Sequence, residues 1–141
     1  MLKILLPVDG SENSDRAVRH LIAMAGHCGA MDVRVVNVQA PFLYVEVLLK
    51  PRQEVIDAWT HKAGKDASRS ACTLLDAAGI PYTLELVEGE IAETLVRCAE
   101  HEKCDMIVMG TRGMGTVANL VLGSVATKVI HLVHIPVTLV K

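Results

Sequence analysis

Aromatic side chains are scarce in this chain of 141 residues: they make up 3% of the sequence, although hydrophobic residues make up 51%. The high hydrophobic content excludes an intrinsically disordered chain. Unbroken apolar runs long enough for a membrane are also missing, since a spanning helix needs about 20 mostly apolar residues. The most apolar stretch, 117–140, is interrupted by Lys128, two histidines and Pro136. We therefore expect no membrane span and interpret this stretch as a buried helix followed by a buried strand.

An excess of positive charge is absent as well. The 14 Lys and Arg residues stand against 16 Asp and Glu residues, which gives a formal net charge of −2. Proteins that bind nucleic acids neutralise phosphates with clustered Lys and Arg side chains. The sequence therefore gives no sign of a nucleic-acid partner.

The four cysteines lack the spacing of a small disulfide scaffold, and no signal-peptide pattern precedes them. A cytoplasmic protein with reduced thiols is the expectation that follows. Cys98, His101 and Cys104 are spaced by three residues, as metal ligands sometimes are. Steps of three along a helix turn Cys98 and Cys104 to different sides, so we predict no metal site there.

Short aliphatic runs alternate with longer segments of helical periodicity. The runs cover residues 2–8, 33–38, 82–87, 105–109 and 137–140. Continuous aliphatic runs are typical of parallel strands whose two faces are both covered, so we expect all five strands to be buried on both faces. The alternation predicts a single doubly wound α/β domain over residues 1–141, with helices on both faces of a parallel sheet.

Capping and stop signals place four helices between these strands. Ser11 is suited to cap the first helix, and Gly26 and Gly29 are suited to end it. The other helices are expected at 53–78, at 91–102 and from Ser124 to just before Pro136. The last helix is expected to bury Val125, Val129, Leu132 and Val133.

The segment 39–52 is the least regular part of the chain. It contains two prolines and apolar candidates for exposure, namely Phe42, Leu43, Val45, Leu48 and Leu49. An ordered surface loop and a lid or partner surface both remain open for this segment.

Two loops at strand ends hold the candidate site. Ligands of open α/β sheets bind beyond the carboxyl ends of the strands, where the strand order reverses. Residues 7–11 follow the first strand and residues 110–113 follow the fourth, so the two loops meet over one crevice if these strands are adjacent. Asp9 in the first loop either contacts a ligand or serves only as a helix-entry residue beside Ser11.

The second loop is rich in glycine and leads to a helix start at Gly123-Ser124. The free amides and the positive dipole end of a helix start favour a phosphate group. Two familiar phosphate motifs fit poorly, because a Walker loop requires a Gly-Lys pair and a dinucleotide fingerprint requires glycines directly after the first strand. We predict a nucleotide whose phosphates lie on the helix start.

The glycine spacing resembles the nucleotide-binding signature of the universal stress protein family: Gly110, two residues, Gly113, nine residues, then Gly123-Ser124. Further segments resemble the family in the same order, so that the resemblance covers essentially the whole chain: 4–11, 35–38, 89–92, 105–110, 123–126 and 135–137. The resemblance implies a Rossmann-like fold with strand order 3-2-1-4-5 and an ATP site, for which we expect Mg²⁺ or Mn²⁺ as the accompanying ion. It also implies dimerisation through the C-terminal strand.

Matching the motif residue by residue implies the composition of the site. It comprises Pro7, Val8, Asp9, Val38, Met109, Gly110, Arg112, Gly113, Gly123, Ser124, Val125 and Ala126. The first six are implied to lie against adenosine, and the others against the ribose and the phosphates. One departure is Asn37, where many members have histidine. Because no aromatic residue falls in these loops, we expect adenine to lie against Val8, Val38 and backbone with little ring stacking.

The leading functional hypothesis is an ATP-binding stress-response protein that acts as a nucleotide-responsive signalling or protective module. The alternative is a slow ATPase or adenylate-processing enzyme that uses the same site, although no nucleophile–base–acid set is readable. A dimeric interaction module with a vestigial site is a third hypothesis. The last strand, 137–140, is expected at a sheet edge, and an exposed apolar edge favours pairing with a second copy.

Overall fold

The computed structural model describes residues 1–41, 48, 50–112 and 122–141. Predictions that concern Gly113 and most of the apolar residues of the 39–52 segment lie outside the described residues. Leu48 is described and is 61% exposed, as expected.

Five parallel strands form one sheet in the order β3-β2-β1-β4-β5. The strands are β1 (Leu2–Pro7), β2 (Met31–Gln39), β3 (Tyr82–Glu88), β4 (Met106–Gly110) and β5 (Val137–Val140). The helices are α1 (Glu12–Cys28), α3 (Gln53–Ala77), α4 (Ile91–His101) and α5 (Ser124–Leu132). The predicted doubly wound α/β fold and the strand order are confirmed.

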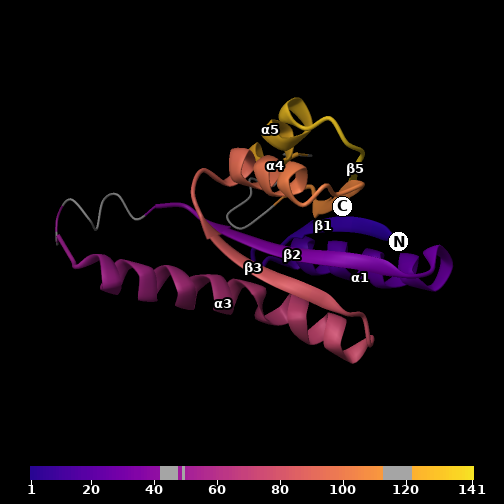
Figure 1. The fold of residues 1–141 in the computed structure, drawn as a ribbon, viewed down its shortest axis with the longest axis horizontal. Helices are drawn as coiled ribbons and strands as arrows, with labels where there is room; N and C mark the ends of the chain where they lie inside the picture. Colours follow the sequence, from indigo (N-terminus) through magenta and orange to yellow (C-terminus); the bar gives the residue numbers. More distant parts are fainter. Residues whose placement is uncertain (42–47, 49, 113–121) are drawn as a thin grey trace.

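The helices lie in two layers, one on each face of the sheet (Figure 1). Helices α1 and α3 cover one face, whereas α4 and α5 cover the other. Strand β1 shows why: Ile4 and Leu6 lie in the core beside α1 and α3, and Leu5 lies in the core beside α4 and α5. Alternation of side chains along a strand buries both sets when both faces are covered.

The prediction that the strands are buried on both faces is confirmed for β1, β2 and β4, but it is wrong for the two edge strands, β3 and β5. Each residue of β3 is either half-buried or exposed, and those of β5 are all half-buried. An edge strand has a neighbour on one side only, and the helix layers cover the centre of the sheet more fully than its margins. The aliphatic run of β5 therefore remains partly open to solvent.

Several element boundaries differ from the sequence prediction. Helix α1 continues through Gly26 and ends at Gly29, whose φ of 74° suits glycine alone among common residues. Helix α5 ends at Leu132, which is 39% exposed, so the prediction that Leu132 is buried is wrong. A nine-residue helix buries one narrow face, here Ala126 and Val129, and Leu132 lies about 60° around the axis from Val129. Among the described helices, none is long and apolar enough to cross a membrane.

Candidate functional site

The carboxyl ends of β1 and β4 lie side by side, because these two strands pair in parallel with Ile4 opposite Met106. Strand order reverses between them, since β2 and β3 follow on one side and β5 on the other. The loop after β1 and the loop after β4 therefore share one edge of the sheet. Gly110 brings them into contact: a Cβ atom there would lie 2.9 Å from the backbone carbonyl of Asn13 at the start of α1.

The loop after β1 is held by a chain of short hydrogen bonds. The Val8 amide donates to the Val36 carbonyl at 2.9 Å. One Asp9 carboxylate oxygen accepts from the Ser11 amide at 2.9 Å, and the Ser11 hydroxyl in turn caps α1 by accepting from the Ser14 amide. Asp9 is nevertheless exposed, so it fulfils the helix-entry role while its carboxylate stays open to a ligand.

The start of α5 is fixed beside the end of β4. The Gly123 amide donates to the Thr111 carbonyl at 2.6 Å, and the Thr111 amide donates to the Val140 carbonyl at 3.0 Å. Within the described residues no side chain caps this helix, and its first turn carries no acidic residue. The first amides of a helix have no partner within the helix. Those of Ser124, Val125 and Ala126 therefore form an uncapped helix start at the shared edge.

The other helices differ in this respect. Helix α1 is capped by Ser11 and helix α4 by the Glu90 carboxylate, and both carry acidic residues in the first turn. Helix α3 has no side-chain cap but does have Glu54 in its first turn. Among the described helices, α5 is thus the one whose positive end is balanced by neither a cap nor an acid, which makes it the helix start best suited to an anion.

The apolar candidates lie on opposite faces of the sheet. Val38 and Met109 are buried in the core beside α4 and α5, whereas Val8 is buried in the core beside α1 and α3. Pro7 and Gly110 are half-buried at the ends of their strands, and Arg112 is half-buried just beyond β4. Gly113 lies outside the described residues. Val8, Val38 and Met109 thus belong to the two cores that support this edge of the sheet.

Two residues at this edge escaped the sequence prediction of the site. Asn37 is 2% exposed, and its side-chain amide donates to the Val8 carbonyl at 2.8 Å. Thr111 is 5% exposed, and its hydroxyl has no hydrogen-bond partner within the described part of the chain. A polar residue inside an aliphatic strand was a usable signal for Asn37. Nothing in the sequence marked the burial of Thr111.

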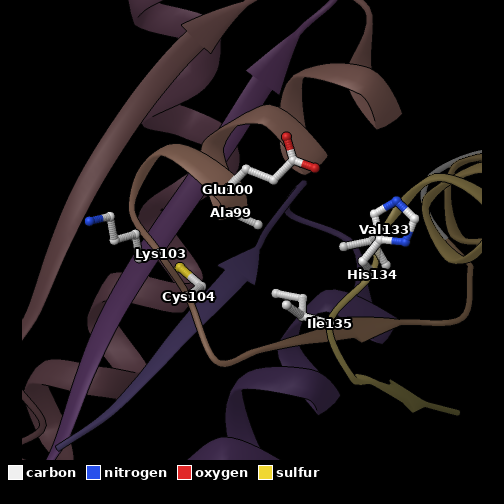
Figure 2. A pocket seen from close by; sticks show the side chains of 7 residues that line it. All are labelled: Ala99, Glu100, Lys103, Cys104, Val133, His134 and Ile135. Carbon is white, nitrogen blue, oxygen red and sulfur yellow. The ribbon is translucent and has the colours of Figure 1, made fainter.

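A cavity of about 240 Å³ lies at the opposite end of the sheet, where α4 ends and β4 and β5 begin. Figure 2 shows its lining side chains, which come from Ala99, Glu100, Lys103, Cys104, Val133, His134 and Ile135. Burial raises the pKa of the Cys104 thiol to about 11, so this thiol is protonated at neutral pH. The cavity is separate from the edge described above.

No group of three or more His, Cys, Asp or Glu side chains within residues 1–41, 48, 50–112 and 122–141 is arranged to hold a metal ion. Cys98, His101 and Cys104 differ in environment: Cys98 is half-buried, His101 is exposed and Cys104 is buried. Helix α4 ends at His101, so Cys104 lies beyond the helix.

A doubly wound parallel sheet with an uncapped helix start at its strand-order reversal defines a Rossmann-like α/β protein, a class in which nucleotides bind at this edge. The chain belongs to the universal stress protein family, whose sequence profile matches residues 1–141. It is 34% identical to universal stress protein MJ0531 of Methanocaldococcus jannaschii over 99% of this chain and 81% of that protein.

Solved structures agree with this assignment. The structure of protein MJ0577 of the same organism superposes with a TM-score of 0.81 at 27% identity, over 99% of this chain and 95% of that one. A universal stress protein crystallised in complex with cAMP superposes with a TM-score of 0.72 at 25% identity, over 99% and 97% of the two chains. The family resemblance inferred from the glycine spacing is therefore confirmed.

Proposed function

We propose that this universal stress protein binds ATP at the shared edge of β1 and β4, with the phosphates on the start of α5. The uncapped start of α5 carries the proposal, because its N-cap residue makes no side-chain hydrogen bond and its first turn carries no acidic residue, so its first amides and positive dipole end suit an anion. The complex of a related universal stress protein with cAMP supports an adenine nucleotide as the ligand class.

In this arrangement Gly123, Ser124, Val125 and Ala126 hold the phosphates through backbone amides and the serine hydroxyl. Asp9 faces the adenosine, supported by Pro7 and Val8 on one side and by Val38, Met109 and Gly110 on the other. Arg112 and Gly113 face the ribose and phosphates. Asp9 is the one carboxylate among the proposed ligands, so the phosphates themselves supply most of the ligands of an accompanying Mg²⁺ or Mn²⁺ ion.

The protein acts, in this proposal, as a nucleotide-responsive stress-response module in the cytoplasm. It does so as a homodimer joined through β5. Strand β5 is an edge strand whose residues are half-buried. Helix α5, which precedes it in the chain, exposes Ile130 and Leu132 at 39% each. Pairing with a second copy would cover apolar surface that a monomer leaves in water.

Isothermal titration with ATP and Mg²⁺ tests the proposed ligand. We expect saturable binding by the wild-type protein and its loss in Gly123→Val, because a branched side chain there obstructs access to the first amides of α5. Gly26→Val is the matched control, since a Cβ at Gly26 meets nothing within 4 Å and the position lies away from the site. Parallel titrations with cAMP and AMP identify the preferred nucleotide.

Absence of heat at millimolar ATP from the folded wild-type protein would reject ATP binding. Equal loss of binding in Gly26→Val would attribute the effect of Gly123→Val to general destabilisation. Identification of any nucleotide released on denaturing freshly isolated protein gives an independent answer.

A further inference from the structure

The pairing of β1 with β2 ends in an unusual way at Val8. The Val8 amide makes the last backbone bond of the ladder, to the Val36 carbonyl at 2.9 Å. In a parallel pair the Val8 carbonyl would next accept from the amide of Val38. Here it accepts from the side-chain amide nitrogen of Asn37 at 2.8 Å. A side chain therefore takes the place of a backbone donor where β1 ends.

The orientation of the Asn37 amide is fixed from its other end. Its Oδ1 accepts from the Gln39 side-chain nitrogen at 2.8 Å, so its nitrogen is directed to Val8. Helix α3 packs closely over it at Gly64, where a Cβ atom would lie 3.3 Å from Oδ1. The amide is 2% exposed, so water does not compete for either bond. A buried amide with both ends satisfied holds one position.

The chain changes direction directly after this bond. Gly10 has a φ of 82°, and a Cβ atom there would lie 3.2 Å from the Ala67 carbonyl oxygen of α3. The Asp9 amide donates to the Ser14 hydroxyl at a longer 3.3 Å. The bond from Asn37 to Val8 is thus the last short tie to the sheet before Asp9, and Asp9 itself is exposed.

We propose that Asn37 is a positioning residue of the nucleotide site: by binding the Val8 carbonyl, its amide ends the β1–β2 ladder and sets the direction in which Asp9 faces the ligand. This inference rests on the proposed nucleotide binding. Gln39 acts through Asn37 by keeping the donor end of the amide toward Val8. A merely structural role for Asn37 would lower stability and leave the ligand affinity of the folded protein unchanged.

Three variants test this role. Asn37→Leu keeps a similar volume without either hydrogen bond, and Gln39→Met removes the donor that orients the amide without adding charge. Val33→Ala is the control. Val33 is fully buried on β2, in the core beside α1 and α3, so this variant loses packing but does not affect a contact with the Val8 carbonyl. Each folded variant is measured by ATP titration and by amide hydrogen exchange of residues 9–11 in the absence of ligand.

We expect Asn37→Leu to weaken ATP binding about tenfold and to speed exchange at residues 9–11 by a similar factor, as loss of one buried hydrogen bond implies. Gln39→Met should act in the same direction, and its effect should vanish in the Asn37→Leu background because the two residues form one network. Val33→Ala should lower stability and change neither readout.

Unchanged exchange at residues 9–11 in Asn37→Leu would overturn the role of Asn37 in holding the turn. Faster exchange with wild-type ATP affinity would overturn its link to the ligand. An effect of Gln39→Met that persists in the Asn37→Leu background would overturn the action of Gln39 through Asn37. Failure of the wild-type protein to bind ATP would instead reject the proposed function. Because hydrogen exchange is measured without ligand, it would still test whether Asn37 holds the turn at residues 9–11.

Discussion

Single residues at the end of β4 decide how closely the two halves of the site approach. Gly110 has no side chain, and the backbone carbonyl of Asn13 occupies the place where a Cβ atom would project. The first turn of α1 therefore lies directly against the last residue of β4. This contact keeps the loop after β1 next to the strand that leads to α5.

Replacement of Gly110 by alanine should separate β4 from α1, because the added Cβ would lie 2.9 Å from the backbone C and O atoms of Asn13. We expect a loss of about 1–3 kcal/mol in the free energy of unfolding, as overpacking generally costs. Urea denaturation measures it. Gly26→Ala is the control: it lies within α1 with nothing within 4 Å, and alanine there should stabilise by up to about 1 kcal/mol. Equal stability of both variants would contradict the close contact.

The amino end of helix α4 is joined by charge to the middle of helix α5. Glu90 caps α4 by accepting from the Glu93 amide at 2.7 Å, and the Lys128 ammonium of α5 lies 3.3 Å from both Glu90 and Glu93. The capping bond from the Glu93 amide, assisted by Lys128, lowers the pKa of the Glu90 carboxyl. Hydrogen bonds to Glu93 and Glu90 raise the pKa of Lys128.

A lowered carboxyl pKa in the folded state makes the cap sensitive to acid. Its stabilising contribution is present above the unfolded pKa, near the ordinary 4.5, and is lost as pH falls through the lower folded value. We therefore expect Glu90→Gln to destabilise the protein at pH 7 and to lose this effect at the acid end of the range. Thermal unfolding across pH measures it, with Glu100→Gln on the exposed surface of the same helix as control. A difference between wild type and Glu90→Gln that stays constant down to low pH would contradict the assignment.

At the scale of the whole molecule, two cores separated by one sheet account for the aliphatic composition. Strands β1, β2 and β4 supply side chains to both cores, and the helix layers close them. Strand β5 lies at one edge of the sheet, so it pairs with another strand, β4, on one of its sides only. The Pro136 carbonyl, just before β5, accepts from the Ile107 amide, and the Val140 carbonyl accepts from the Thr111 amide just after β4. By alternation, Val137 and Leu139 direct their backbone groups outward.

We expect light scattering at micromolar concentration to report a dimer for the wild-type protein. Leu139→Pro should shift the mass to that of a monomer, because proline removes an outward amide that pairing would use. Leu139→Ala is the control, since it loses the same side chain and keeps the amide. A monomeric wild type, or an unchanged dimer in Leu139→Pro, would contradict dimerisation through β5.

The sequence by itself determined the class of fold and the family, and it predicted a candidate site at the carboxyl ends of β1 and β4. Alternating aliphatic runs and helical segments specify a parallel sheet, because strand burial and helix periodicity are local properties of the chain. The glycine spacing up to Gly123-Ser124 marked the family. The burial of Leu132 and of the edge strands was predicted wrongly, since hydrophobicity does not tell which elements end at a margin of the sheet.

Only the tertiary structure decided which atoms meet at that edge. The contact of Gly110 with Asn13 depends on the pairing of β1 with β4, which are far apart in the chain. The bond from Asn37 to Val8 likewise depends on the register of β1 and β2. Composition alone showed an aliphatic protein almost without aromatic residues. Strand register is a long-range property, and it places the polar side chain of Asn37 where it supports the loop that carries Asp9.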